Sequence, residues 1–243
     1  RYKWMRYLLL LLLCILPLRM QCYMGAVMDQ ATECDDAQAR LEVDWNTKDF
    51  SPFTCPSTFT FAVSDVDEIH YVIPNLDPRK DEVGHKCMNE SISYNETIPL
   101  WGDHRPNWPQ YGEYLYVPVQ RWLHNLEHGS IILLYHPCVD PSQLSHLRSL
   151  VQSCLYRHII TPYNKLSEQR PLCLLSWGAR LEMSSVRDSS VVSFIRQHAR
   201  NAPEDISRNG KYSLHLIQPS KIVSTIDDDS LCPSFPNSTT KFS

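Results

Sequence analysis

From residue 130 onward the chain alternates between uninterrupted apolar runs and amphipathic stretches, and this order restricts the fold more than any other feature. Residues 130–136 read SIILLYH, a continuous apolar run typical of a strand that is buried on both faces. Asp140 and Pro141 then open a helix, as its N-cap and its first residue. Apolar side chains recur along this helix at a spacing that places them on one face: Leu144, Leu147, Leu150, Val151 and Cys154.

Four further segments complete the pattern. Residues 158–161 and 172–177 predict short strands, residues 189–202 a second helix, and residues 212–217 a last strand. The series strand, helix, strand, strand, helix, strand predicts an α+β fold of the ferredoxin-like, split βαβ type. Both helices would cover one face of a mostly antiparallel sheet, and Leu147 and Phe194 would be buried beneath them.

The N-terminus has the form of a secretory signal peptide over residues 1–22. An apolar run of eleven residues, Leu8–Leu18, follows the basic residues Lys3 and Arg6. A helix that spans a membrane needs about 20 apolar residues, so this run is too short to be one. A buried N-terminal helix is the alternative, although an unbroken leucine run offers no polar face to water.

The signal peptide and the α+β pattern divide the rest of the chain into three parts. Residues 100–220 form the α+β domain, residues 23–99 a long, loop-rich and glycosylated region, and residues 221–243 a polar tail. No second apolar run of 18 residues follows the signal peptide, so a membrane anchor would have to lie beyond the last residue.

Cysteines and glycosylation sequons support passage through an oxidising compartment. No Cys-x-x-Cys pair is present, which leaves zinc ribbons and thioredoxin-like motifs unsupported. Disulfides that staple the domain are therefore expected, with buried free thiols as the alternative for any one cysteine. The disulfide candidates are Cys34, Cys55, Cys87, Cys138, Cys154, Cys173 and Cys232. The expected glycosylation sites are Asn89, Asn95 and Asn237.

The charge of the chain excludes general binding to nucleic acid. The formal net charge is −4, and residues 1–22 contribute four basic groups and no acid, which leaves −8 for the remainder. Phosphates demand a basic face, so a chain this acidic is a poor candidate for a nucleic-acid partner.

The segment HNLEHG, residues 124–129, holds the strongest candidate for chemistry. His124 and His128 lie one helical turn apart and could share a Zn²⁺ ion, with Glu127 beside them to accept a proton from metal-bound water. A third ligand would come from downstream or upstream: Glu182, Glu204, or His104 oriented by Asp103.

A purely structural role is the alternative for the same segment. Gly129 follows at once and a buried strand begins at residue 130, so the segment is expected at the C-terminal end of a helix. His128 would then interact with the helix dipole and cap the helix rather than bind a metal.

Several stretches of this sequence resemble one protein family: residues 101–106 (WGDHRP), 111–114 (YGEY), 121–129 (RWLHNLEHG), 134–138 (LYHPC) and 200–204 (RNAPE). They are similar to the tumour protein 53-inducible protein 13 family and to a wider uncharacterised domain family that shares the H-x-L-E-H-G motif. The resemblance implies a signal peptide, a membrane or cytoplasmic location, suppression of tumour-cell growth, and no assigned catalytic residue.

Two functions follow from these observations. The first is an uncharacterised secreted or cell-surface glycoprotein that restrains growth through contacts with another protein. The second is a metal-binding domain with a zinc-type site at His104, His124, Glu127 and His128, for which hydrolysis is the expected chemistry.

Overall fold

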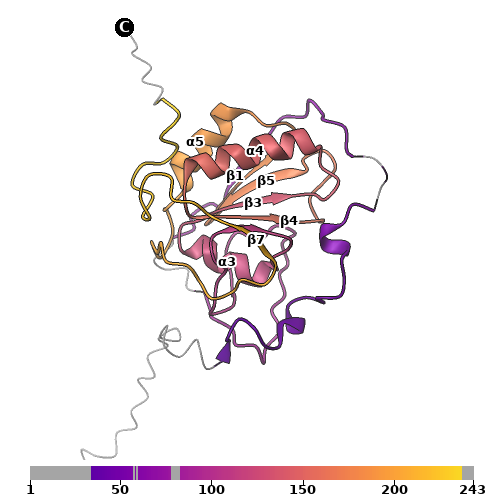
Figure 1. Ribbon diagram of the computed structural model, residues 1–243, viewed down its shortest axis with the longest axis vertical. Coiled ribbons are helices and arrows are strands. Elements are labelled where there is room, and N and C mark those ends of the chain that lie inside the picture. Colours follow the sequence, from indigo (N-terminus) through magenta and orange to yellow (C-terminus); the bar gives the residue numbers. More distant parts are fainter. Residues whose placement is uncertain (1–33, 57, 59, 78–82, 237–243) are drawn as a thin grey trace, which may run out of the picture.

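The computed structural model describes residues 34–56, 58, 60–77 and 83–236, and these form a seven-stranded sheet with three α-helices (Figure 1). The signal peptide over residues 1–22 and the sequon at Asn237 lie outside the described residues. In chain order the elements are η1 (Leu41–Val43), η2 (Ser51–Phe53), β1 (Ile69–Val72), β2 (Gly112–Tyr114), α3 (Val119–Glu127), β3 (Ile131–Tyr135), α4 (Pro141–Cys154), β4 (His158–Pro162), β5 (Leu172–Ser176), β6 (Ala179–Met183), α5 (Asp188–His198) and β7 (Leu216–Pro219).

The predicted α+β class is confirmed, and the sheet is mixed. Its strand order is β1-β6-β5-β3-β4-β2-β7, with β4 parallel to both of its neighbours and every other pair antiparallel. The ferredoxin-like detail is not reproduced, because β3 and β4 pair directly along their whole length. In a split βαβ unit another strand would lie between them.

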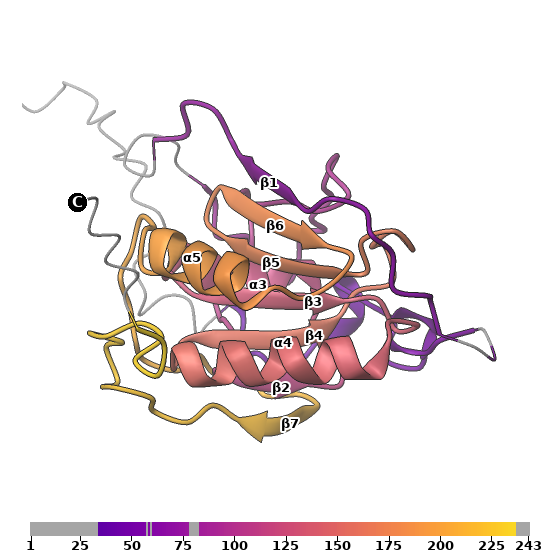
Figure 2. The ribbon, with the colours of Figure 1, turned by 90° about the horizontal axis from the view of Figure 1, so that it is seen from above.

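The two faces of the sheet carry separate cores. Ile131 and Leu133 of β3 point into the core beneath α4 and α5, whereas Ile132 and Leu134 point into the core on the side of α3. Figures 1 and 2 show α4 and α5 together on one face and α3 on the other. This alternation explains the continuous apolar run at residues 130–136, because a strand with two covered faces needs apolar side chains at every position.

Helix α4 begins and packs as the sequence predicts. The Asp140 carboxylate accepts hydrogen bonds from the main-chain N–H groups of Ser142 and Gln143 at 2.9 and 3.1 Å, and Pro141 is the first helical residue. Leu147 of α4 and Phe194 of α5 are both buried in the same core, as expected.

Strand β6 and the end of α5 differ from the sequence-based prediction. A two-residue turn at Trp177 and Gly178 joins β5 to β6, which had no predicted counterpart. Helix α5 ends at His198 instead of residue 202, because Arg200 takes a left-handed conformation and its main-chain N–H donates to the Gly129 carbonyl at 2.8 Å.

The sheet and its packing extend beyond residues 100–220 on both sides. Strand β1 comes from the region predicted to be loops, and it pairs with β6. In the predicted tail, Asp228 is buried and accepts hydrogen bonds from the main-chain N–H groups of Tyr156 and Arg157. Within the described ranges no helix is both long and apolar enough to cross a membrane.

Three disulfides involve these outer segments, and two of them link an outer segment to residues 100–220. They join Cys34 to Cys87, Cys55 to Cys138, and Cys154 to Cys232. The prediction of a disulfide at Cys173 is wrong: this thiol is free and buried in β5. Its neighbours in the core on the α3 side are apolar, and burial raises the pKa of the thiol well above its usual value.

Candidate functional site

The end of helix α3 presents the HNLEHG segment. The helix ends at Glu127, His128 is its C-cap, and Gly129 follows with φ +78°. A glycine is needed there, since a Cβ at this position would lie 2.7 Å from the Cα of Arg200. The predicted position of the segment at a helix C-terminus is thus confirmed.

Three imidazoles converge on one carboxylate oxygen beside this helix end. Glu127 Oε2 lies 3.0 Å from His104 Nε2, 3.4 Å from His85 Nε2 and 3.9 Å from His124 Nε2. One ligand atom from each of these four residues lies within 4.8 Å of every other, which is close enough to hold a metal ion. We call these four residues the buried donor group, because three are buried and His85 is half-buried.

A second set of donors adjoins the first. His128 Nε2 lies 3.2 Å from His124 Nε2 and 3.0 Å from Glu204 Oε2. Glu127, His128 and Glu204 also bring ligand atoms within 4.8 Å of one another, and we call them the outer donor group. Glu127 belongs to both groups.

Main-chain carbonyls determine which ring nitrogen carries the hydrogen in two of the histidines. His104 Nδ1 lies 2.8 Å from the Gly102 carbonyl, and His124 Nδ1 lies 2.6 Å from the Arg105 carbonyl. A carbonyl only accepts, so each Nδ1 must carry the hydrogen, and in a neutral ring Nε2 then offers a lone pair. His104 Nε2 then lies 3.0 Å from Glu127 Oε2, which is itself an acceptor, and His124 Nε2 lies 3.2 Å from His128 Nε2 and 3.9 Å from Glu127 Oε2.

The surroundings keep His124 neutral and Glu127 ionised. Burial lowers the pKa of His124 well below its usual value, and the neighbouring imidazoles of His104, His128 and His85 lower it further. Burial acts on Glu127 in the opposite sense, but His104 and His85 beside the carboxylate outweigh it and hold its pKa below the usual range. Burial also lowers the pKa of His128, against the raising effect of Glu204.

A short bridge places His85 and His104 side by side. The Lys86 N–H donates to the His104 carbonyl at 2.8 Å, and the His104 N–H donates to the Gly84 carbonyl at 3.1 Å. The prediction that Asp103 orients His104 is wrong. The Asp103 carboxylate instead accepts a hydrogen bond from the Gly84 N–H at 2.7 Å. It therefore fixes the segment that carries His85.

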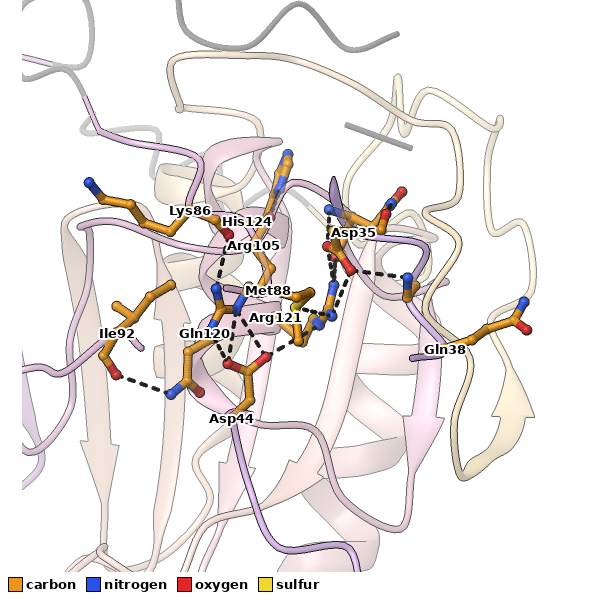
Figure 3. A network of polar contacts seen from close by, with 12 residues as sticks. Asp35, Gln38, Asp44, Lys86, Met88, Ile92, Arg105, Gln120, Arg121 and His124 are labelled. Carbon is orange, nitrogen blue, oxygen red and sulfur yellow. Dashed lines mark hydrogen bonds and ion pairs between the residues drawn. The ribbon is translucent and has the colours of Figure 1, made fainter. Parts of the chain in front are cut away.

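Two buried arginines hold this arrangement from below (Figure 3). Arg105 pairs with Asp44, with Nη2 at 2.6 Å from Oδ1, and it also donates to the carbonyls of Lys86, Cys87 and Glu90. Arg121, one turn before His124 on α3, donates from both Nη atoms to the Asp35 carboxylate. Segment 35–44 thus neutralises both guanidinium groups and ties α3 to the His85 segment.

The outer donor group reaches solvent through Glu204. Its side chain is 41% exposed, whereas the side chain of His128 is fully buried. The Glu204 N–H donates to the Glu127 carbonyl at 3.0 Å, so the main chain sets the position of Glu204. Trp108 covers the buried side, with its ring centroid 4.8 Å from that of His124 and 4.3 Å from that of His128.

The other predicted site residues lie elsewhere. Glu182 is on β6, pairs with Arg180 at 2.6 Å and belongs to neither donor group. Asn89 and Asn95 are exposed, as glycosylation acceptors must be.

Sequence reasoning missed His85. Its side chain reaches the site only because a backbone bridge aligns its segment with residue 104. Nothing in the sequence around residue 85 has a metal-ligand spacing that could have revealed this.

One family model matches the chain, over residues 85–210, and its description is a protein of unknown function, DUF3105. The match spans more than half of the chain and includes all six residues of the two donor groups. No curated protein and no solved structure matches. The chain therefore belongs to the DUF3105 family of proteins of unknown function.

Proposed function

We propose that this domain binds a divalent metal ion through His85, His104, His124 and Glu127, and that this ion is Zn²⁺. The observation that carries the proposal is the meeting of acceptors: two Nε2 atoms, on rings whose Nδ1 atoms are bound to carbonyls, lie 3.0 and 3.9 Å from one carboxylate oxygen. Acceptors that meet in a buried place need a cation between them. A proton on His104 would serve for one contact, whereas a metal ion serves for all four donors.

The donor set suits zinc. Imidazole and carboxylate ligands are typical of Zn²⁺, and donors on one tetrahedral ion lie about 3.3 Å apart. The distances of 3.0, 3.4 and 3.9 Å from Glu127 Oε2 lie around this value. The carbonyls of Gly102 and Arg105 also provide the outer hydrogen bonds that metal-binding histidines usually make.

Four protein ligands make a closed site, and such sites stabilise a fold. An ion here would tie the His85 segment, the His104 segment and α3 together. Metal binding would therefore add to the free energy of unfolding, and a chelator would lower the melting temperature.

The test is elemental analysis of the secreted, folded protein. We expect at least one equivalent of metal per chain in the wild type, and its loss in His104→Ala and in His124→Ala. The matched control is His146→Ala, since His146 lies on the exposed face of α4 and pairs only with Asp188 in the described chain. A folded wild type without metal would overturn the proposal.

We further propose that the protein enters the secretory pathway and carries glycans at Asn89 and Asn95. The three disulfides, the exposed sequons and the N-terminal apolar run support this. A glycosidase should increase the mobility of the secreted protein, and Asn89→Gln with Asn95→Gln should remove most of that shift. Recovery of an unglycosylated, reduced protein from the cytosol would contradict it.

Restraint of growth through a protein partner rests on the family resemblance alone. It is tested by the proliferation of cells that express the wild-type protein against cells that express His104→Ala. An equal reduction of proliferation by both proteins would separate the growth function from the metal site. No reduction by either protein would overturn the growth function.

A further inference from the structure

The six donors around Glu127 are too widely spread for one ion. Two donors on opposite sides of one metal lie at most about 4.2 Å apart, since each bond is about 2.0–2.1 Å long. Even with a spacing of 4.8 Å allowed, the donors separate into two groups that share Glu127. A metal held by the buried donor group would therefore leave His128 and Glu204 without an ion.

The charges point the same way. The ion pairs of Glu127 and Glu204 within the described residues all involve histidines, whereas the nearby Asp205 is neutralised by Arg157 and Arg200. Two carboxylates therefore meet at this place, and in the described residues neither of them has an arginine or lysine partner. A single divalent ion shared with the buried donor group would not contact Glu204.

The two groups also differ in access. The buried donor group supplies four ligands, of which three are buried and His85 is half-buried. The outer donor group supplies three, and its Glu204 side chain is 41% exposed. Four protein ligands are typical of a structural zinc site, and three ligands beside solvent are typical of a site with a free coordination position.

We propose that Glu127, His128 and Glu204 bind a second divalent ion, with the Glu127 carboxylate bridging the two metals and one coordination position left for water or a small anion. This proposal rests on the proposed metal site at the buried donor group. A shared carboxylate between two ions is the arrangement that two-metal centres use.

A side-chain hydrogen bond between His128 and Glu204 without metal is the competing explanation. The position of the segment from Arg200 to Glu204 does not depend on that bond. The main-chain N–H groups of these two residues already donate to the carbonyls of Gly129 and Glu127. Glu204→Gln keeps the size of the side chain and its ability to hydrogen-bond, but it removes the charge that a metal requires. This variant therefore separates the two explanations without removing the loop contacts.

The experiment is elemental analysis of full-length secreted protein, equilibrated with Zn²⁺ and freed of excess metal. We expect two equivalents in the wild type and one in Glu204→Gln, with unchanged melting of the apoprotein. The matched control Glu182→Gln, a carboxylate in neither donor group, should keep two. One equivalent in the wild type, retained in Glu204→Gln and lost in His104→Ala, would overturn the second ion and leave the proposed function intact. No metal in either protein would overturn both.

Cobalt provides an independent readout of the free position. With Co²⁺ in place of Zn²⁺, added azide should change the visible spectrum of the wild type but not that of Glu204→Gln. A Co²⁺ spectrum that azide leaves unchanged in the wild type would overturn the free coordination position.

Discussion

The main-chain carbonyl of Arg105 lies 2.6 Å from Nδ1 of His124, so one residue both supports the site and fixes the protonation of its central histidine. The Arg105 side chain meanwhile binds Asp44 and three carbonyls from the segment that follows His85. Figure 3 shows Asp44 between Arg105 and Arg121, with His124 above them. The ion-pair network and the donor groups thus form one connected structure.

Replacement of Arg105 should therefore be severe. Arg105→Met leaves the buried Asp44 carboxylate without its main partner and three carbonyls without a donor, at an expected cost of about 3–5 kcal/mol in the free energy of unfolding. Urea titration measures it, with Lys165→Met at an exposed position as the control. Equal stability of the two variants would show that the network contributes little.

The core beneath α4 gives a second prediction. Leu147 is 0% exposed, so Leu147→Ala should lower the free energy of unfolding by about 2–5 kcal/mol. Ser145→Ala on the exposed side of the same helix should change it by less than about 0.5 kcal/mol. A small effect at position 147 would mean that the helix is rotated relative to the sheet.

Local patterns predicted those parts of the fold that neighbouring residues determine. The Asp140–Pro141 helix start and the end of α3 before Gly129 depend on capping chemistry within a few residues, and both are confirmed. Strand β1 and the direct pairing of β3 with β4 depend on contacts between distant segments. A pattern of apolar residues in one sequence carries no information on such pairing.

The same distinction applies to the site. The spacing of His124, Glu127 and His128 was visible in the sequence, because a helical turn sets it. Glu204 joins this segment through a backbone hydrogen bond to Glu127, and His85 joins through its bridge to His104. Neither contact produces a regular spacing of residues in the sequence. The sequence therefore could not distinguish Glu182 from Glu204 as a ligand, and it did not reveal His85.

The disulfide pattern gives a third prediction. Peptide mapping without reduction should find the pairs Cys34–Cys87, Cys55–Cys138 and Cys154–Cys232. The thiol of Cys173 should react with an alkylating reagent only after unfolding, since it is buried and its pKa is raised. Rapid alkylation in the native protein, or a disulfide that includes Cys173, would contradict the structure.

A buried histidine outside the site predicts loss of stability in acid. Burial lowers the pKa of His158 in β4 to about 4, against an ordinary value of 6.5. The unfolded chain therefore takes up a proton at a higher pH than the folded chain does. The contribution is complete above pH 6.5 and is lost as the pH falls toward 4, by about 3 kcal/mol in all.

Urea titrations at several pH values measure this effect. His158→Asn can still donate to the Leu155 carbonyl, which accepts from His158 Nδ1 at 2.9 Å, but it cannot take up the proton. Its free energy of unfolding should fall less steeply between pH 6.5 and 4 than that of the wild type. Parallel curves for the two proteins would show that His158 does not contribute to the acid sensitivity.

Gly129 links the helix end to the outer donor group, and its replacement gives the last prediction. Gly129→Ala places a Cβ 2.7 Å from the Arg200 Cα at a φ of +78°, so the segment from Arg200 to Glu204 must move away from α3. Strain at such a φ alone costs about 1–2 kcal/mol.

The matched control is Gly178→Ala in the turn before β6. Gly178 has a φ of +71°, and a Cβ there would meet only the side chain of Leu76. Both variants should lose stability in urea, but only Gly129→Ala should lose the metal equivalent that depends on Glu204. If both variants kept the same metal content, the contact between Gly129 and Arg200 would have no part in placing Glu204.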